Sequence, residues 1–181
     1  MARIPYPDPA SQSDEVRDRL KRLGSLNVTR MMSHAEGVMT AYSKLGTQLL
    51  LRGTLDPVLR ECVILRVGQL CRSDYEWYQH VSVARAVGMP EAMLDAIGEG
   101  RFADLPDDHR IAIGFAEEIH GDGAVSPATF AQGRARFSEA QLVELCILVG
   151  HYIMTAGFLR SFEIEAEDTP PLGASLRAKA D

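Results

Sequence analysis

The chain has 181 residues, of which 46% are hydrophobic and 24% charged, as expected of one globular domain with tails. Its formal net charge of -6, from 25 acidic and 19 basic residues, argues against nucleic acid as a partner, because no dense basic segment offsets the acidic excess. No apolar segment approaches the roughly 20 residues that span a bilayer, and residues 1–9 lack the apolar segment of a secretion signal. We therefore expect a cytoplasmic protein with no membrane partner.

The chain is expected to open with an arm and a short helix. Residues 1–12 are rich in proline and polar side chains, which predicts an extended arm that is either loose or laid on a neighbouring subunit. Ser13 has the character of a helix N-cap, and Gly24 that of a stop signal. The pattern between them predicts a helix that ends near Leu23.

A longer helix is expected over residues 28–51, with Asn27 as its N-cap. Apolar residues recur there at helical spacing, and Gly37 and Gly46 mark possible breaks. The methionines of this segment are interpreted as core residues, with a role in lining a pocket as the alternative.

The centre of the chain, residues 57–88, is expected to form two helices with a break at residues 71–73. Asp56 and Pro57 form a typical start, an N-cap followed by proline at the first helical position. The first helix is apolar on so many sides that it should be buried. The second is expected to end at Gly88.

The remaining pattern is helical throughout, so the predicted fold class is all-α. We expect one helical domain over residues 13–168, followed by a polar C-terminal tail at 169–181. Helices are predicted after the central pair at 91–97, 107–120, 127–137 and 139–162.

A polar row on the second central helix is the main indication of function. Ser73, Glu76 and His80 stand at relative positions 0, 3 and 7, which lie on one helical face, and the row continues as Val83 and Val87. A carboxylate and an imidazole are therefore expected to face a packed interior. Buried ionisable groups are costly unless they are paired, and such groups concentrate at functional sites.

Glu61, on the preceding helix, could add a second carboxylate to this row. Two acids and one histidine in a dry site suit acid–base chemistry, although a solvated or structural role for Glu76 and His80 stays open. A metal site would need a further histidine or cysteine, which the nearby sequence lacks. Ser73 as a nucleophile is disfavoured, because His80 lies two turns away, about 10 Å along the axis. We expect neither a metal nor a cofactor.

The three cysteines predict no disulfide framework and no zinc site. Their number is odd, they are far apart, and no Cys-x-x-Cys occurs. Cys62 and Cys146 are interpreted as small core residues. Cys71 is less clear, because it lies at the expected helix break beside the polar row.

These features resemble the carboxymuconolactone decarboxylase and alkylhydroperoxidase-D-like superfamily over residues 55–100. The resemblance implies that superfamily's helical domain, and it also implies that the subunits assemble into trimers or hexamers. The residues that carry it are Glu61, Ser73, Tyr75, Glu76, Trp77, His80 and Gly88. We expect Glu61, Glu76 and His80 to be catalytic, and Ser73, Tyr75 and Trp77 to bind substrate.

In the peroxidase branch of this superfamily, two cysteines occupy the positions of Ser73 and Glu76. Neither a hydroxyl nor a carboxylate can cycle through a disulfide, so the resemblance favours proton transfer. The predicted function is decarboxylation, isomerisation or hydrolysis of a small organic acid or lactone by a homo-oligomeric enzyme without a cofactor. Two alternatives stay open: a peroxidase-related protein that uses Cys71, and a non-catalytic protein that binds a small ligand.

Overall fold

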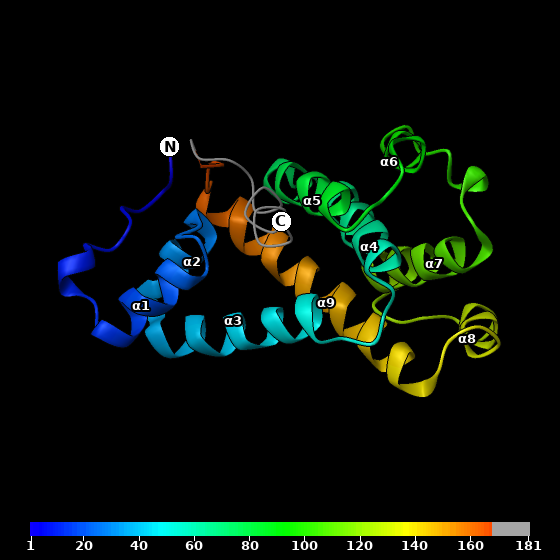
Figure 1. Ribbon diagram of the computed structural model, residues 1–181, viewed down its shortest axis with the longest axis horizontal. Helices are drawn as coiled ribbons and strands as arrows, with labels where there is room; N and C mark the ends of the chain where they lie inside the picture. Colours follow the sequence, from blue (N-terminus) through cyan, green and yellow to red (C-terminus); the bar gives the residue numbers. More distant parts are fainter. Residues whose placement is uncertain (168–181) are drawn as a thin grey trace.

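A computed structural model describes residues 1–167, and no strand occurs in this part of the chain (Figure 1). The predicted all-α fold class is confirmed. The α-helices are α1 Asp14–Arg22, α2 Asn27–Met32, α3 Glu36–Leu51, α4 Pro57–Leu70, α5 Asp74–Ala86, α6 Glu91–Gly98, α7 Asp107–Asp122, α8 Pro127–Arg134 and α9 Glu139–Phe162.

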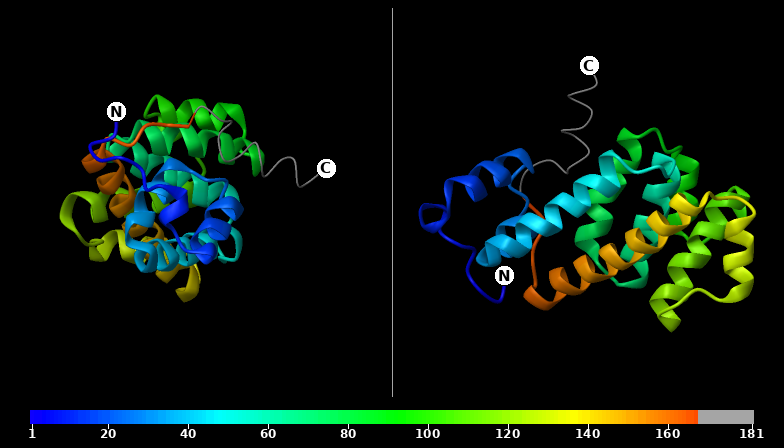
Figure 2. Two further views of the ribbon diagram at one scale, coloured as in Figure 1. Left: turned by 90° about the vertical axis from the view of Figure 1, so that its left-hand side faces the viewer. Right: turned by 90° about the horizontal axis from the view of Figure 1, so that it is seen from below.

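Helix α4 lies at the centre of the molecule and contacts α5, α7 and α9 (Figure 1). Its residues Val63, Ile64 and Val67 are fully buried in one core cluster with Phe115 of α7 and Leu145 of α9. Burial on all sides explains why this helix is apolar around most of its circumference. Helix α3 runs beside α9 on another side of the molecule (Figure 2).

Short-range signals set where several helices begin. The Asp56 carboxylate accepts hydrogen bonds from the backbone amides of Val58 and Leu59, and Pro57 fills the first position of α4. Ser138 and Gln141 form a reciprocal capping box at the start of α9. These signals act over three or four residues, so the sequence alone predicts them well.

The helix predicted over residues 28–51 is divided in the structure. The break is a turn of 3₁₀ helix at Ser33–Ala35, whereas Gly37 and Gly46 both lie inside α3. The Glu36 carboxylate, at the start of α3, accepts hydrogen bonds of 3.1 Å from the backbone amide and the hydroxyl of the N-cap of α1. The position of the break is thus coupled to a contact with another helix, which periodicity does not reveal.

The N-terminal arm contacts its own chain at the end of α9. The backbone amide of Arg3 donates to the carbonyl of Phe162 at 2.9 Å, and the Arg3 side chain pairs with Glu163. The predicted tail at 169–181, and residue 168 of the predicted domain, lie outside the described residues.

Helix α9 is long and apolar enough to cross a membrane by length and composition, contrary to the expectation from the sequence. Half of the most apolar 18-residue segment of this helix is buried inside the fold, where Leu145, Leu148 and Val149 are fully buried. The core helix of a globular domain has these same properties, so this feature is weak support for a membrane span.

Candidate active site

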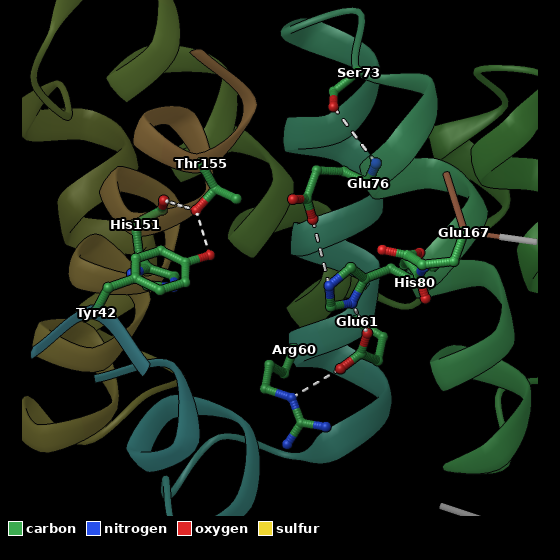
Figure 3. Close-up of polar contacts among 10 residues, drawn as sticks. Tyr42, Arg60, Glu61, Ser73, Glu76, His80, His151, Thr155 and Glu167 are labelled. Carbon is green, nitrogen blue, oxygen red and sulfur yellow. Dashed lines mark hydrogen bonds and ion pairs between the residues drawn. The ribbon is translucent and has the colours of Figure 1, made fainter. Parts of the chain in front are cut away.

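Helices α4 and α5 bring Glu61, Glu76 and His80 into direct contact (Figure 3). Nδ1 of His80 lies 2.7 Å from Oε2 of Glu61, and Nε2 of the same ring lies 3.4 Å from Oε2 of Glu76. The imidazole is therefore held between two carboxylates. The shorter of the two contacts is with Glu61, which lies on the other helix.

The cluster is buried and includes an arginine that the sequence had not indicated. Nε of Arg60 donates to Oε1 of Glu61 at 3.0 Å. Glu61 is fully buried, while Arg60, Glu76 and His80 are at most 7% exposed. Each charged group has an oppositely charged partner, which is the arrangement that makes such burial tolerable.

The turn between α4 and α5 sets this geometry. Arg72 adopts a left-handed backbone conformation with φ of 52°, and Ser73 caps α5 by accepting a hydrogen bond from the amide of Glu76. A Cβ at Gly68 of α4 would lie 3.5 Å from Cβ of Glu76, an ordinary contact distance, so the two helices are close together at this point. The chain thus folds back sharply enough to place Glu76 over α4.

Burial and mutual charge perturb the ionisation of the cluster. Burial raises the pKa of Glu76 to about 7, and the Glu61 charge adds to this, while His80 opposes it. Burial lowers the pKa of His80, but the Glu61 carboxylate, through its charge and hydrogen bond, and the charge of Glu76 outweigh that effect and raise the pKa overall. Near neutral pH, Glu76 is therefore close to half protonated.

The three residues expected to bind substrate have separate contacts. Ser73 is the N-cap of α5, as described above. The Tyr75 hydroxyl donates to Oε1 of Glu167 at 2.6 Å, and its ring packs among residues of α1 and α2. Trp77 packs on Gly98 of α6, where a Cβ would lie 3.7 Å from its ring. Their assignment to substrate binding stays a prediction.

A second polar group, missed in the sequence, lies across from Glu76 (Figure 3). The Tyr42 hydroxyl of α3 and the Thr155 hydroxyl of α9 are 3.0 Å apart, and Thr155 donates to the carbonyl of His151 at 2.7 Å. The rings of Tyr42 and His151 stack at 4.7 Å. The four-residue spacing of His151 and Thr155 on α9 was the only available signal.

Tyr152 links the two polar groups. Its ring meets the His80 ring edge-on at 4.9 Å and the His151 ring edge-on at 5.4 Å. Tyr152 therefore contacts one side chain of the α4–α5 cluster and one of the α3–α9 group.

The cysteines are free and unactivated. Burial raises the pKa of Cys62 to about 12, and it also raises the pKa of the half-buried Cys71 and Cys146. A raised pKa disfavours the thiolate, which is the reactive form. Within residues 1–167, no group of three or more His, Cys, Asp or Glu side chains is arranged to hold a metal ion.

Residues 36–103, which contain the whole α4–α5 cluster, match the sequence profile of the carboxymuconolactone decarboxylase family. The uncharacterized protein YnjA of Escherichia coli is 29% identical over 123 residues. That match covers 64% of this chain and 65% of YnjA, so it spans just under two thirds of the relative.

Solved structures share the fold at low sequence identity. An uncharacterized peroxidase-related protein from Ralstonia eutropha, described as an alkylhydroperoxidase AhpD core, superposes with a TM-score of 0.82 at 18% identity, over 92% of this chain and 93% of its own. A peroxidase-related protein from a Silicibacter species gives 0.78 at 19% identity, over 92% and 91%. The debrominase Bmp8, as a cysteine-to-alanine variant bound to 2,3,4-tribromopyrrole, gives 0.77 at 14% identity over 100% of both chains. These structures show that the chain has an alkylhydroperoxidase-D-like helical fold, and its residues 36–103 match the carboxymuconolactone decarboxylase family profile.

Proposed function

We propose that this protein is a cofactor-free acid–base enzyme that acts on a small organic acid or lactone. The observation that supports it is the contact between Glu76 and His80 in a buried cluster, where the pKa of Glu76 is raised to about 7. A group with a pKa near the working pH can both give and take a proton, which is the requirement for general acid–base catalysis.

The contacts suggest a division of roles. Glu61, held by Arg60, accepts the Nδ1 proton of His80 and fixes the orientation of the ring. Glu76 faces Nε2, and the pair of Glu76 and His80 exchanges a proton with substrate. In a decarboxylation, the bond to the carboxylate carbon breaks, carbon dioxide leaves, the electron pair stays on the substrate, and the pair of Glu76 and His80 supplies the proton. Isomerisation and hydrolysis use the same group as base and then as acid.

A thiol reaction has less support. Peroxidase-related proteins and a debrominase share the fold, but the half-buried Cys71 has a raised pKa and lies at the C-terminal end of α4. Non-catalytic ligand binding is the remaining candidate, and turnover of any substrate distinguishes it from an enzyme.

A panel of small lactones and keto acids tests the proposal. Carbon dioxide release and proton uptake would be followed for the wild type, for His80→Gln and for His109→Gln. His109 is a half-buried histidine on α7, and it serves as the matched control. We expect His80→Gln to lose about 10²- to 10⁴-fold in rate, the usual scale for a general acid–base group. Wild-type turnover by folded His80→Gln would refute the proposed role.

A further inference from the structure

The second polar group holds a buried atom that the fold does not satisfy. His151 is 5% exposed, and its Nδ1 is buried without a hydrogen-bond partner in the described part of the chain. Buried polar atoms in native proteins are nearly always paired, so an orphan of this kind needs an explanation. One explanation is a ligand that supplies the missing partner.

The neighbouring hydroxyls cannot supply it, because their hydrogens are already committed. Thr155 donates to the carbonyl of His151, so its oxygen must accept the hydrogen of the Tyr42 hydroxyl. Among these three side chains, Nδ1 of His151 is the buried polar atom left without a partner in the described part of the chain. Burial, and then the charge of His80, lower the pKa of His151 to about 4, so the ring is neutral at pH 7.

This surface lies beside the proton-transfer cluster. The Tyr152 ring contacts both the His80 ring, at 4.9 Å, and the His151 ring, at 5.4 Å. Figure 3 shows Glu76 between the His80 ring on one side and the Tyr42 and Thr155 side chains on the other. A molecule that exchanges a proton with Glu76 would therefore lie against this surface.

We propose that Tyr42, His151 and Thr155 form the substrate-binding wall of the active site, in which Nδ1 of His151 donates a hydrogen bond to a carbonyl or carboxyl oxygen of the substrate. The inference rests on the proposed acid–base function and adds the group that positions the substrate for it. Tyr42 holds the His151 ring by stacking, and Thr155 fixes the Tyr42 hydroxyl, so the wall is pre-organised.

Nuclear magnetic resonance of the histidine ring nitrogens tests the wall without a known substrate. γ-Butyrolactone serves as the carbonyl probe and acetate as the carboxylate probe, each titrated into the full-length wild type. We expect the Nδ1 resonance of His151 to shift with at least one probe, while the His109 resonances stay constant. The probe that shifts this resonance identifies whether a carbonyl or a carboxylate oxygen accepts the hydrogen bond from Nδ1 of His151.

The variant His151→Phe keeps a stacking ring and removes both nitrogens. We expect it to weaken probe binding by about 3- to 10-fold, the scale of one hydrogen bond, and to leave the stability of the apo protein unchanged or higher, because an unpaired buried atom is lost. A merely structural histidine would instead lower stability in this variant. His109→Phe is the matched control, and the wild-type titration stands even if His151→Phe does not fold.

The outcomes separate this inference from the proposed function. The proposed substrate-binding role of His151 is wrong if neither probe shifts its Nδ1 resonance. It is also wrong if His151→Phe binds the probe that shifts this resonance as tightly as the wild type does. The acid–base function would still stand if His80→Gln loses turnover. Conversely, a shift of the His151 resonance together with wild-type turnover in His80→Gln would support the substrate-binding role of His151 and reject the proton-transfer role of His80.

Discussion

At the scale of single residues, Glu76 makes the folded state sensitive to pH. Its pKa rises from 4.5 to about 7 on folding, so the folded protein holds this proton more tightly than the unfolded chain does. The free energy of unfolding therefore falls as pH rises from about 4.5 to about 7 because of this group. The raised pKa of His80 acts in the same direction, but only above about pH 6.5.

Glu76→Gln should remove the Glu76 contribution. We expect the free energy of unfolding of the variant, relative to that of the wild type, to increase as pH rises from 5 to 6.5. His80 contributes only above this range. Urea denaturation at both values measures this difference. Glu118→Gln is the control. Hydrogen bonds from Thr129 and Ser126 lower the pKa of Glu118, so its ionisation does not reduce the free energy of unfolding as pH rises from 5 to 6.5. A difference independent of pH in Glu76→Gln would show that Glu76 is already ionised at pH 5.

Cys71 provides a second test at this scale. Because burial raises its pKa, and because Ser73 and Glu76 stand at the superfamily's thiol positions, we expect little peroxide consumption supported by dithiols. A peroxide assay on the wild type and on Cys71→Ser measures it. Activity present in the wild type and absent from the serine variant would instead support the peroxidase-related alternative.

Between elements, the approach of α5 to α4 leaves room for only a small side chain at position 68. A single Cβ there would meet Glu76 at an ordinary contact distance of 3.5 Å, so Gly68→Ala should be tolerated. Gly68→Leu should push α5 outward, cost about 1–3 kcal/mol of stability by overpacking, and weaken the contact between Glu76 and His80. Thermal denaturation measures the cost. Gly121→Leu on α7 is the control, because a Cβ at Gly121 meets nothing within 4 Å.

At the scale of the whole molecule, α9 presents an apolar face that no described element covers. Val143, Ile147 and Met154 are 64%, 49% and 52% exposed, and their spacing places them on one side of the helix. A groove of about 430 Å³ between α8 and α9 adjoins them, lined in part by Phe130 and Cys146. We propose that a second copy of the chain covers this face, in a homo-oligomer.

Light scattering at micromolar concentration tests the assembly. We expect the mass of an oligomer for the wild type and a smaller mass for the double variant Ile147→Glu and Met154→Glu, because burying two carboxylates at an apolar interface is costly. Val38→Glu, at an apolar position on α3 that is 64% exposed, should leave the mass unchanged. A monomeric wild type would contradict the proposal.

Features that depend on interactions between residues close together in the chain could be predicted from the sequence. The cap at Asp56-Pro57, the capping box at Ser138, the bounds of α9 and the shared face of Glu76 and His80 all follow from hydrogen bonds and periodicity within one or two helical turns. Burial of α4 also followed, since a helix apolar around most of its circumference needs neighbours on most sides.

Only the tertiary structure decided which side chains meet across helices. Glu61 lies 19 residues before His80 yet makes the shorter contact with its ring, and Tyr42 meets Thr155 across 113 residues. Tyr75 is likewise held by Glu167, 92 residues away, and Trp77 by α6. Such contacts depend on how helices cross and how closely they approach, and these quantities arise from packing the entire core at once. The periodicity of one helix fixes the direction in which its side chains point, but the neighbours they reach are set by the other helices.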